Sequence, residues 1–156
     1  MAIGLLRGAA AGAAGSTALN AAAYLDMVVR ARPASSTPER TVEAIVGRVP
    51  VSVPGRGAAR ENRVSGLAGL SGILTGVGVG AAYGALRRLG FRPGPLAGAV
   101  VTGLSVMAFT DSSMAGLGVS DPRTWKAMDW VSDVLPHLVY GAVTWAVLRA
   151  LDDVPA

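Results

Sequence analysis

The 156-residue sequence contains no cysteine, one histidine, one lysine and few aromatic residues. Without cysteine the chain can form no disulfide, no thiolate nucleophile and no cysteine-based metal site. Two phenylalanines and three tryptophans would fill a soluble core of this size poorly. Charged residues make up only 15% of the chain, whereas a soluble domain usually carries about 25%. Together with 51% apolar residues and 21 glycines, this composition favours a protein embedded in lipid.

The basic residues are distributed as they are in membrane proteins. The net charge of +4 is the difference between fourteen basic and ten acidic residues, and the basic residues lie mainly in the segments between apolar runs. Charge beside a membrane span is commonly of this kind, and it suits the anionic surface of a cytoplasmic leaflet. The sequence therefore predicts the lipid bilayer as a partner and argues against nucleic acid.

Four apolar segments are long enough to be membrane spans, at approximately residues 8–27, 64–86, 95–119 and 134–151. Each reaches or approaches the ~20 residues that cross ~30 Å of hydrocarbon. The first segment is rich in alanine and glycine, so we expect it to insert only with neighbours to pack on, and it also fits a cleaved signal peptide. The predicted fold is an all-α membrane protein, a four-helix transmembrane bundle, in a single domain over residues 1–156.

The long connection between the first two segments contains a short amphipathic helix at approximately residues 38–49. Its apolar residues recur at helical spacing on one face: Val42, Ile45, Val46 and Val49. Such a helix either lies on the membrane surface or packs against the bundle. The orientation of the bundle stays open, because the first and third loops carry more basic residues, whereas the second has the densest basic cluster.

The second apolar segment has a regular glycine pattern, with glycine every four residues at Gly72, Gly76, Gly80 and Gly84. Lipid gives helices no hydrophobic reason to associate, so their pairing depends on the close backbone approach that small residues allow. The pattern predicts tight helix packing, either within the chain or with a second copy of it or another membrane protein.

Polar residues gather toward one side of the predicted bundle: Asn20, Asp26, Asp111, Asp133 and His137. In an up-and-down bundle all five fall in the leaflet nearest the first and third loops. Ionisable groups at membrane depth are costly and often functional. Two interpretations remain open: a structural polar cluster, or a proton-responsive or ligand-binding site built on Asp111, Asp133 and His137.

Signatures of catalysis are missing from the sequence. The single histidine has no serine in a G-x-S-x-G elbow, and the glycines at residues 76–80 lie inside an apolar segment, where a phosphate loop is not expected. One histidine with carboxylates on separate helices gives no metal-ligand spacing. We therefore predict no catalytic residue, no metal site, no cofactor and a protein that is not an enzyme.

Three stretches resemble the YagU-like family of small bacterial inner-membrane proteins. They are the start at residues 6–12, the third segment with its opening at residues 94–100 and its end at 114–118, and the opening of the fourth segment at residues 131–139. The resemblance implies a multi-helix inner-membrane protein with no assigned reaction and a link to acid tolerance. The arginine-rich first loop and the shorter chain depart from that family.

From these observations we expect a non-enzymatic, multi-pass protein of the bacterial cytoplasmic membrane. Its first predicted role is that of an accessory or envelope-maintenance component that associates through its glycine-rich helix faces. The alternative is a small transporter or proton-linked permeation protein that uses the intramembrane polar cluster.

Overall fold

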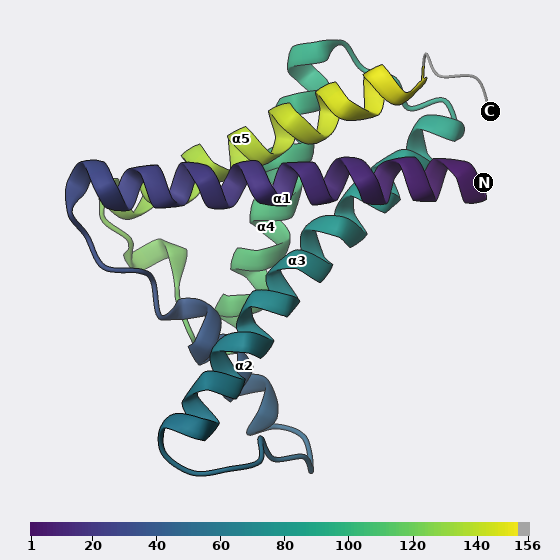
Figure 1. Ribbon diagram of the computed structural model, residues 1–156. Coiled ribbons are helices and arrows are strands. Elements are labelled where there is room, and N and C mark those ends of the chain that lie inside the picture. Colours follow the sequence, from purple (N-terminus) through teal and green to yellow (C-terminus); the bar gives the residue numbers. More distant parts are fainter. Residues whose placement is uncertain (153–156) are drawn as a thin grey trace.

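The computed structural model describes residues 1–152 as an all-helical chain with no strand among them. The part of the predicted domain at residues 153–156 lies outside the described residues. The elements, in chain order, are α1 (Ala2–Arg30), α2 (Thr37–Val46), α3 (Ala58–Arg88), α4 (Pro95–Gly116), the 3₁₀ turn η1 (Pro122–Thr124) and α5 (Ala127–Asp152). Figure 1 shows α1 and α5 running antiparallel beside each other, α3 crossing α1 obliquely, and α2 beside the first part of α3.

Within residues 1–152, three helices, α3, α4 and α5, are long and apolar enough to cross a membrane by length and composition. The chain therefore has the helices of a membrane protein, but the prediction of four such segments is wrong in its count. α1 has 29 residues, ample length for a span, and is not among the three. The physical reason is its alanine and glycine content, since these residues offer little apolar surface compared with leucine or valine.

Two of the membrane-compatible helices begin earlier than the apolar runs that predicted them. α3 starts at Ala58 and α5 at Ala127, whereas the predicted segments began near residues 64 and 134. At the start of α5 the backbone N–H of Lys126 donates to the Asp129 carboxylate at 2.9 Å. Both helices therefore extend beyond their apolar parts into polar turns, which hydropathy alone does not detect.

The amphipathic helix α2 packs against the bundle, which was one of the two interpretations of its apolar face. Val42 is buried together with Val53, Val64 and Ala68, so the helix and the segment after it are anchored on the first part of α3. The Glu43 carboxylate also accepts hydrogen bonds from the Arg60 guanidinium. α2 ends at Val46, three residues before the predicted end, since Gly47 and Pro50 are poor helix formers.

Glycines allow α1 and α3 to touch backbone to backbone. A Cβ on Gly8 would lie 2.3 Å from the carbonyl oxygen of Gly80, and one on Gly84 would lie 2.1 Å from the carbonyl oxygen of Gly4. Gly12 meets Gly76 in the same way, with its Cβ 2.4 Å from that carbonyl oxygen. Such distances leave no room for any side chain, so the glycine pattern places two antiparallel helices in direct contact.

The contact between α1 and α3 ends abruptly at Gly76. A Cβ on Gly72 would meet no atom within 4 Å, and the same holds for Gly69 and Gly66. α1 and α3 diverge beyond this point, as Figure 1 shows. Of the four glycines predicted to pack, Gly72 is therefore the one that the structure leaves uncovered by the chain itself.

α5 completes the packing around α1. The Tyr140 hydroxyl donates to the carbonyl oxygen of Gly76 at 2.6 Å, linking α5 to α3. Gly15 of α1 makes room for this bridge, because a Cβ there would lie 2.9 Å from the Tyr140 ring. The buried cluster of Ala11, Tyr83, Trp145 and Leu148 then joins α1, α3 and α5.

Candidate functional site

The candidate site lies between α4 and α5, whose backbones approach closely at two glycines. A Cβ on Gly103 would lie 2.5 Å from the carbonyl oxygen of His137, and one on Gly141 would lie 2.1 Å from the carbonyl oxygen of Ala99. Because the helices are antiparallel, this contact places the later half of α4 beside the first half of α5. Asp111 therefore faces the segment that carries Asp133 and His137.

Asp111, Asp133 and His137 form one group, which we call the carboxylate–histidine cluster. The Asp111 and Asp133 side chains face each other closely enough to interact, and Asp111 also interacts electrostatically with His137. Asp111 is 7% exposed, and the side chains of Asp133 and His137 are 20% and 13% exposed. Three of the five predicted polar residues are thus brought together from two helices.

The cluster contains carboxylate oxygens that lack partners. Oδ1 of Asp111 and Oδ2 of Asp133 are buried and accept no hydrogen bond from any described residue. Two neighbouring carboxylates repel each other when both are ionised, and a shared proton or a bound cation removes that repulsion. The unpartnered oxygens are acceptors for a proton, so the cluster has the chemistry of a proton-binding site.

The histidine is oriented by its own helix. His137 Nδ1 lies 2.8 Å from the carbonyl oxygen of Asp133 and 3.4 Å from Asp133 Oδ1. An imidazole that donates from Nδ1 to the carbonyl is the tautomer whose Nε2 accepts a proton. His137 is therefore held with one nitrogen engaged and the other able to take up a proton.

The early start of α5 places Asp133 and Pro136 within the helix. A helix beginning near residue 134 would have made Asp133 a cap, with Pro136 in the first turn. Because α5 begins at Ala127, both residues lie inside the helix. Pro136 has no N–H and leaves the carbonyl of Ser132 without its usual partner. The polar side chains thus lie beside an interruption of the helical hydrogen bonds.

Asp26 belongs to a separate group at the end of α1. Its carboxylate binds Arg30 at 2.5 Å and Arg32 at 2.5 Å, and Arg30 also donates to the Ser132 hydroxyl of α5. Asp26 is therefore neutralised by two arginines and serves to join α1 to α5. Asn20 is exposed on α1 and forms no hydrogen bond with the described residues, so it lies outside both groups.

A buried charged group at the opposite end of the helices was missed by the sequence analysis. Arg87 is 7% exposed, and it pairs with Asp152 and lies 4.5 Å from the centre of the Trp145 ring. In the sequence it belongs to the basic cluster at the end of an apolar run, next to Arg88, where an exposed arginine is expected. The only signal in the sequence was its position in the last helical turn, three residues after Gly84.

Among the described residues, no group of three or more histidine, cysteine, aspartate or glutamate side chains, the carboxylate–histidine cluster included, is arranged to hold a metal ion. Comparison of the chain with protein-family models, curated proteins and solved structures finds no significant match. The site is therefore interpreted from its own residues.

Proposed function

We propose that this protein is a small, non-enzymatic, multi-pass membrane protein that exchanges protons at the carboxylate–histidine cluster. One observation carries the proposal: Asp111, 7% exposed, faces Asp133 and His137 with one carboxylate oxygen unpartnered. A buried carboxylate without a partner costs stability, and ionisable residues within membrane helices commonly mark ion pathways or proton relays. The corresponding activity is that of a small transporter or proton-linked permeation protein.

In this proposal the three side chains have distinct roles. Asp111 and Asp133 hold one proton between them, which removes the repulsion between two ionised carboxylates. His137 takes a second proton at Nε2 while Nδ1 stays on the Asp133 carbonyl. The nearby Asp26 is already paired with Arg30 and Arg32, so it has no part in the exchange.

Flux measurements in lipid vesicles test the proposal. The purified protein is reconstituted with a pH-sensitive dye inside the vesicles, and proton flux is followed after a pH step with Na⁺ or K⁺ as the counter-gradient. We expect Asp111→Asn to abolish flux and His137→Ala to reduce it about 100-fold or more, which is the usual effect of removing a proton-transfer group. The matched control is Asp129→Asn, since Asp129 is an exposed acid in the first turn of α5.

Each arm of this experiment has a defined consequence. Flux that follows the pH gradient alone supports proton exchange at the cluster, and flux that requires Na⁺ or K⁺ rejects it. Absence of flux in the unmodified protein, or equal flux in Asp111→Asn and in the Asp129→Asn control, rejects the proposal.

We propose four membrane crossings in the bacterial cytoplasmic membrane, with α1 inserted through its packing on α3 and α5. The close glycine contacts between α1 and α3 support this arrangement, since α3 is itself suited to span. The absence of cysteine allows single cysteines to report the topology. If α1 crosses, Ala2→Cys and Leu89→Cys label from one side of the membrane and Ser35→Cys from the other. Labelling of Ala2→Cys from the same side as Ser35→Cys excludes the crossing.

The accessory role remains a second candidate, because part of the glycine pattern is uncovered. Gly76, Gly80 and Gly84 are occupied by α1, whereas Gly69 and Gly72 have open space where a Cβ would be. A partner helix or a second copy would therefore associate through the first half of α3. Cross-linking in native membranes tests this role. A cross-linked product that is lost in Gly72→Leu and kept in Gly78→Leu supports it. A strictly monomeric protein with no cross-linked partner rejects it.

A further inference from the structure

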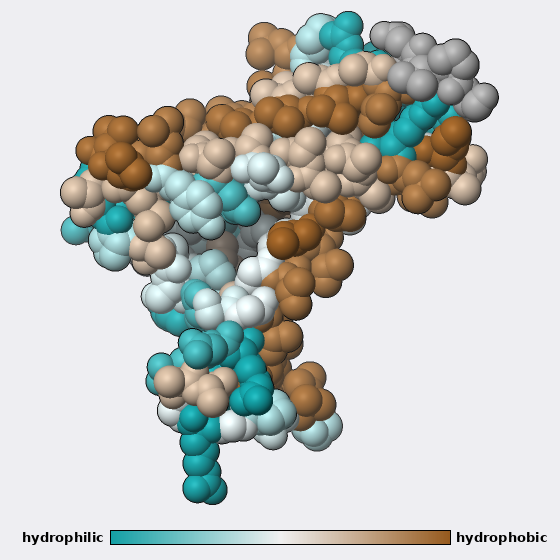
Figure 2. Space-filling view, in the orientation of Figure 1, coloured by the Kyte–Doolittle hydropathy of each residue, from teal (hydrophilic) through white to brown (hydrophobic). Residues whose placement is uncertain are grey.

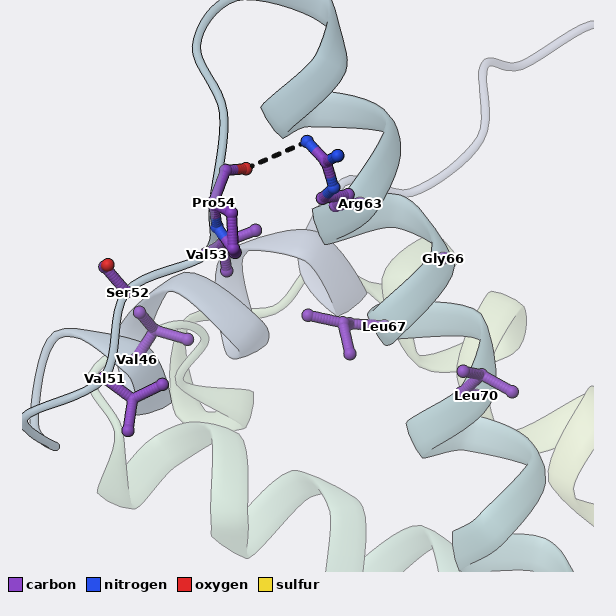
Figure 3. Close-up of a pocket in the computed structure, with 9 residues that line it drawn as sticks. All are labelled: Val46, Val51, Ser52, Val53, Pro54, Arg63, Gly66, Leu67 and Leu70. Carbon is purple, nitrogen blue, oxygen red and sulfur yellow. Dashed lines mark hydrogen bonds between the residues drawn. The ribbon is translucent and has the colours of Figure 1, made fainter.

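A groove lies between the segment that follows α2 and the first part of α3. Its volume is about 500 Å³, which is within the ~300–1,000 Å³ of typical ligand pockets. Figure 3 shows its apolar walls, with one arginine, Arg63, at the end nearest Pro54. The apolar walls are formed by Val46, Val51, Val53, Leu67 and Leu70.

The groove is continuous with the apolar surface of α3. Leu67 and Leu70 are exposed, and the exposed Ile73 and Leu74 follow on the same helix. In Figure 2 this surface continues along α3 as a hydrophobic band, while hydrophilic residues cover the neighbouring end of the molecule near α2. α3 is one of the three helices suited to span a membrane, so a molecule in the groove would lie partly among lipid chains.

Arg63 at the end of the groove has hydrogen-bonding capacity to spare. Its Nη1 donates to the Pro54 carbonyl at 3.2 Å and to that of Ala59 at 3.4 Å, whereas Nε and Nη2 donate to none of the described residues. It also has no carboxylate partner there. Gly55, at φ +93°, makes room for the guanidinium, because a Cβ at this position would lie 2.5 Å from Nη1.

The surrounding segment has an excess of positive charge. Residues 28–63 contain seven arginines and three glutamates. Two of these arginines are paired with Asp26 and one with Glu43, and Arg63 retains its charge without such a pair. An arginine with two free donors binds phosphate oxygens well, because its planar fork matches their geometry.

We propose that this groove binds an anionic phospholipid of the surrounding bilayer, with an acyl chain along its apolar walls and the phosphate on Arg63. The apolar walls that continue onto a membrane-compatible helix favour a lipid over a soluble ligand. The unpaired arginine within a basic segment selects a lipid with net negative charge. The proposal depends on the membrane location of α3 and is independent of the carboxylate–histidine cluster.

Native mass spectrometry of the delipidated full-length protein tests this site. Phosphatidylglycerol and phosphatidylcholine with identical chains are added back in equal amounts, and the retained lipid is counted. We expect one phosphatidylglycerol to be retained preferentially. Arg63→Gln should weaken its binding about five-fold, which corresponds to the ~1 kcal/mol contributed by one basic residue at a membrane surface. Arg63→Lys should restore part of the preference, because it keeps the charge and loses the planar fork.

A second pair of variants tests the acyl-chain part of the groove. Gly66 lines the groove, and Gly66→Leu would fill the space where its Cβ meets no atom within 4 Å. We expect this variant to weaken the binding of both lipids. Gly78→Leu is the matched control, since Gly78 is an exposed glycine of the same helix with equally open space, and it should retain lipid as the unmodified protein does.

Several results would overturn the proposal. Equal retention of the two lipids by the unmodified protein rejects the selectivity for negative charge. Arg40 is exposed on α2. If Arg40→Gln and Arg63→Gln lose phosphatidylglycerol binding equally, the lipid is attracted by the positive charge of the whole segment and not by a specific site. Dimers that persist without lipid and disappear in Gly66→Leu assign the groove to a second copy of the chain.

Discussion

The molecule contains two interfaces built from glycine, and they differ in what the glycines bring together. Between α1 and α3, Gly8 and Gly80 allow contact of backbones, with no ionisable group between them. Between α4 and α5, Gly103 and Gly141 allow the same approach, but the continuation of that interface holds Asp111 and Asp133. Close packing therefore serves stability in the first interface and confines two carboxylates in the second. The predictions below test this difference, beginning with the largest expected effect.

Gly80→Leu should strongly destabilise the α1–α3 interface. A Cβ at Gly80 would lie 2.4 Å from the Gly8 carbonyl oxygen, so a leucine forces the helices apart. We expect a loss of about 3 kcal/mol of unfolding free energy, at the upper end for overpacking, measured by denaturant unfolding in micelles. The control Gly78→Leu should change stability little. Equal losses in the two variants would mean that α1 does not cover Gly80.

Tyr140→Phe should weaken the connection between α5 and α3 without changing the shape of the interface. The variant loses the hydrogen bond from the buried hydroxyl to the Gly76 carbonyl, and we expect about 1 kcal/mol less unfolding free energy. The same unfolding assay measures the effect. A loss close to that of Gly80→Leu would indicate that this hydrogen bond between α5 and α3 contributes as much to stability as the glycine contact between α1 and α3.

Asp111→Asn should separate function from stability in the α4–α5 interface. The amide keeps the size of the carboxylate and removes a charge that has an unpartnered oxygen. We therefore expect stability to stay within about 1 kcal/mol or to rise, while vesicle flux is lost. A loss of several kcal/mol, by contrast, would give Asp111 a structural role like that of the glycines.

Acid should loosen α2 from α3, the smallest of these effects. Hydrogen bonds from the Arg60 guanidinium lower the pKa of Glu43 below its usual 4.5. A carboxyl with a lowered folded-state pKa stabilises the fold above its unfolded pKa, and this contribution is lost as the pH falls through the folded value. Hydrogen exchange of α2 amides should therefore accelerate below about pH 4. Glu43→Gln should remove this dependence, and persistence of the acceleration in that variant would assign it to another group.

Much of the helix pattern could be predicted from the sequence, because apolar runs and glycine spacing are local features. The predicted segment at residues 64–86 lies within α3, and the segment at 95–119 overlaps α4 over nearly its whole length. The alanine-rich first segment was predicted to need neighbours, and α1 indeed contacts both α3 and α5. Its apolarity was overestimated, since length and small residues alone do not provide enough hydrophobic surface.

The candidate site could be predicted only in part. Asp133 and His137 are four residues apart, so their shared helix face follows from helical geometry. Asp26 and Asn20 were grouped with them because all lie toward the same end of the predicted helices. The structure separates Asp26, through its two arginines, and Asn20, through its position on an exposed face. Depth along a helix can be estimated from sequence, whereas the direction of a side chain depends on the neighbouring helix.

The sequence by itself determined where helices form and which of their faces are small enough for close contact. It also restricted any ionisable chemistry at membrane depth to a few carboxylates and one histidine. Tertiary structure decided which helix covers each glycine, and therefore that α1 occupies Gly76 to Gly84 while Gly72 stays open. It also decided that Asp111 meets Asp133 and His137. The physical reason is that helical periodicity specifies a face, whereas the partner of that face depends on long-range packing between helices.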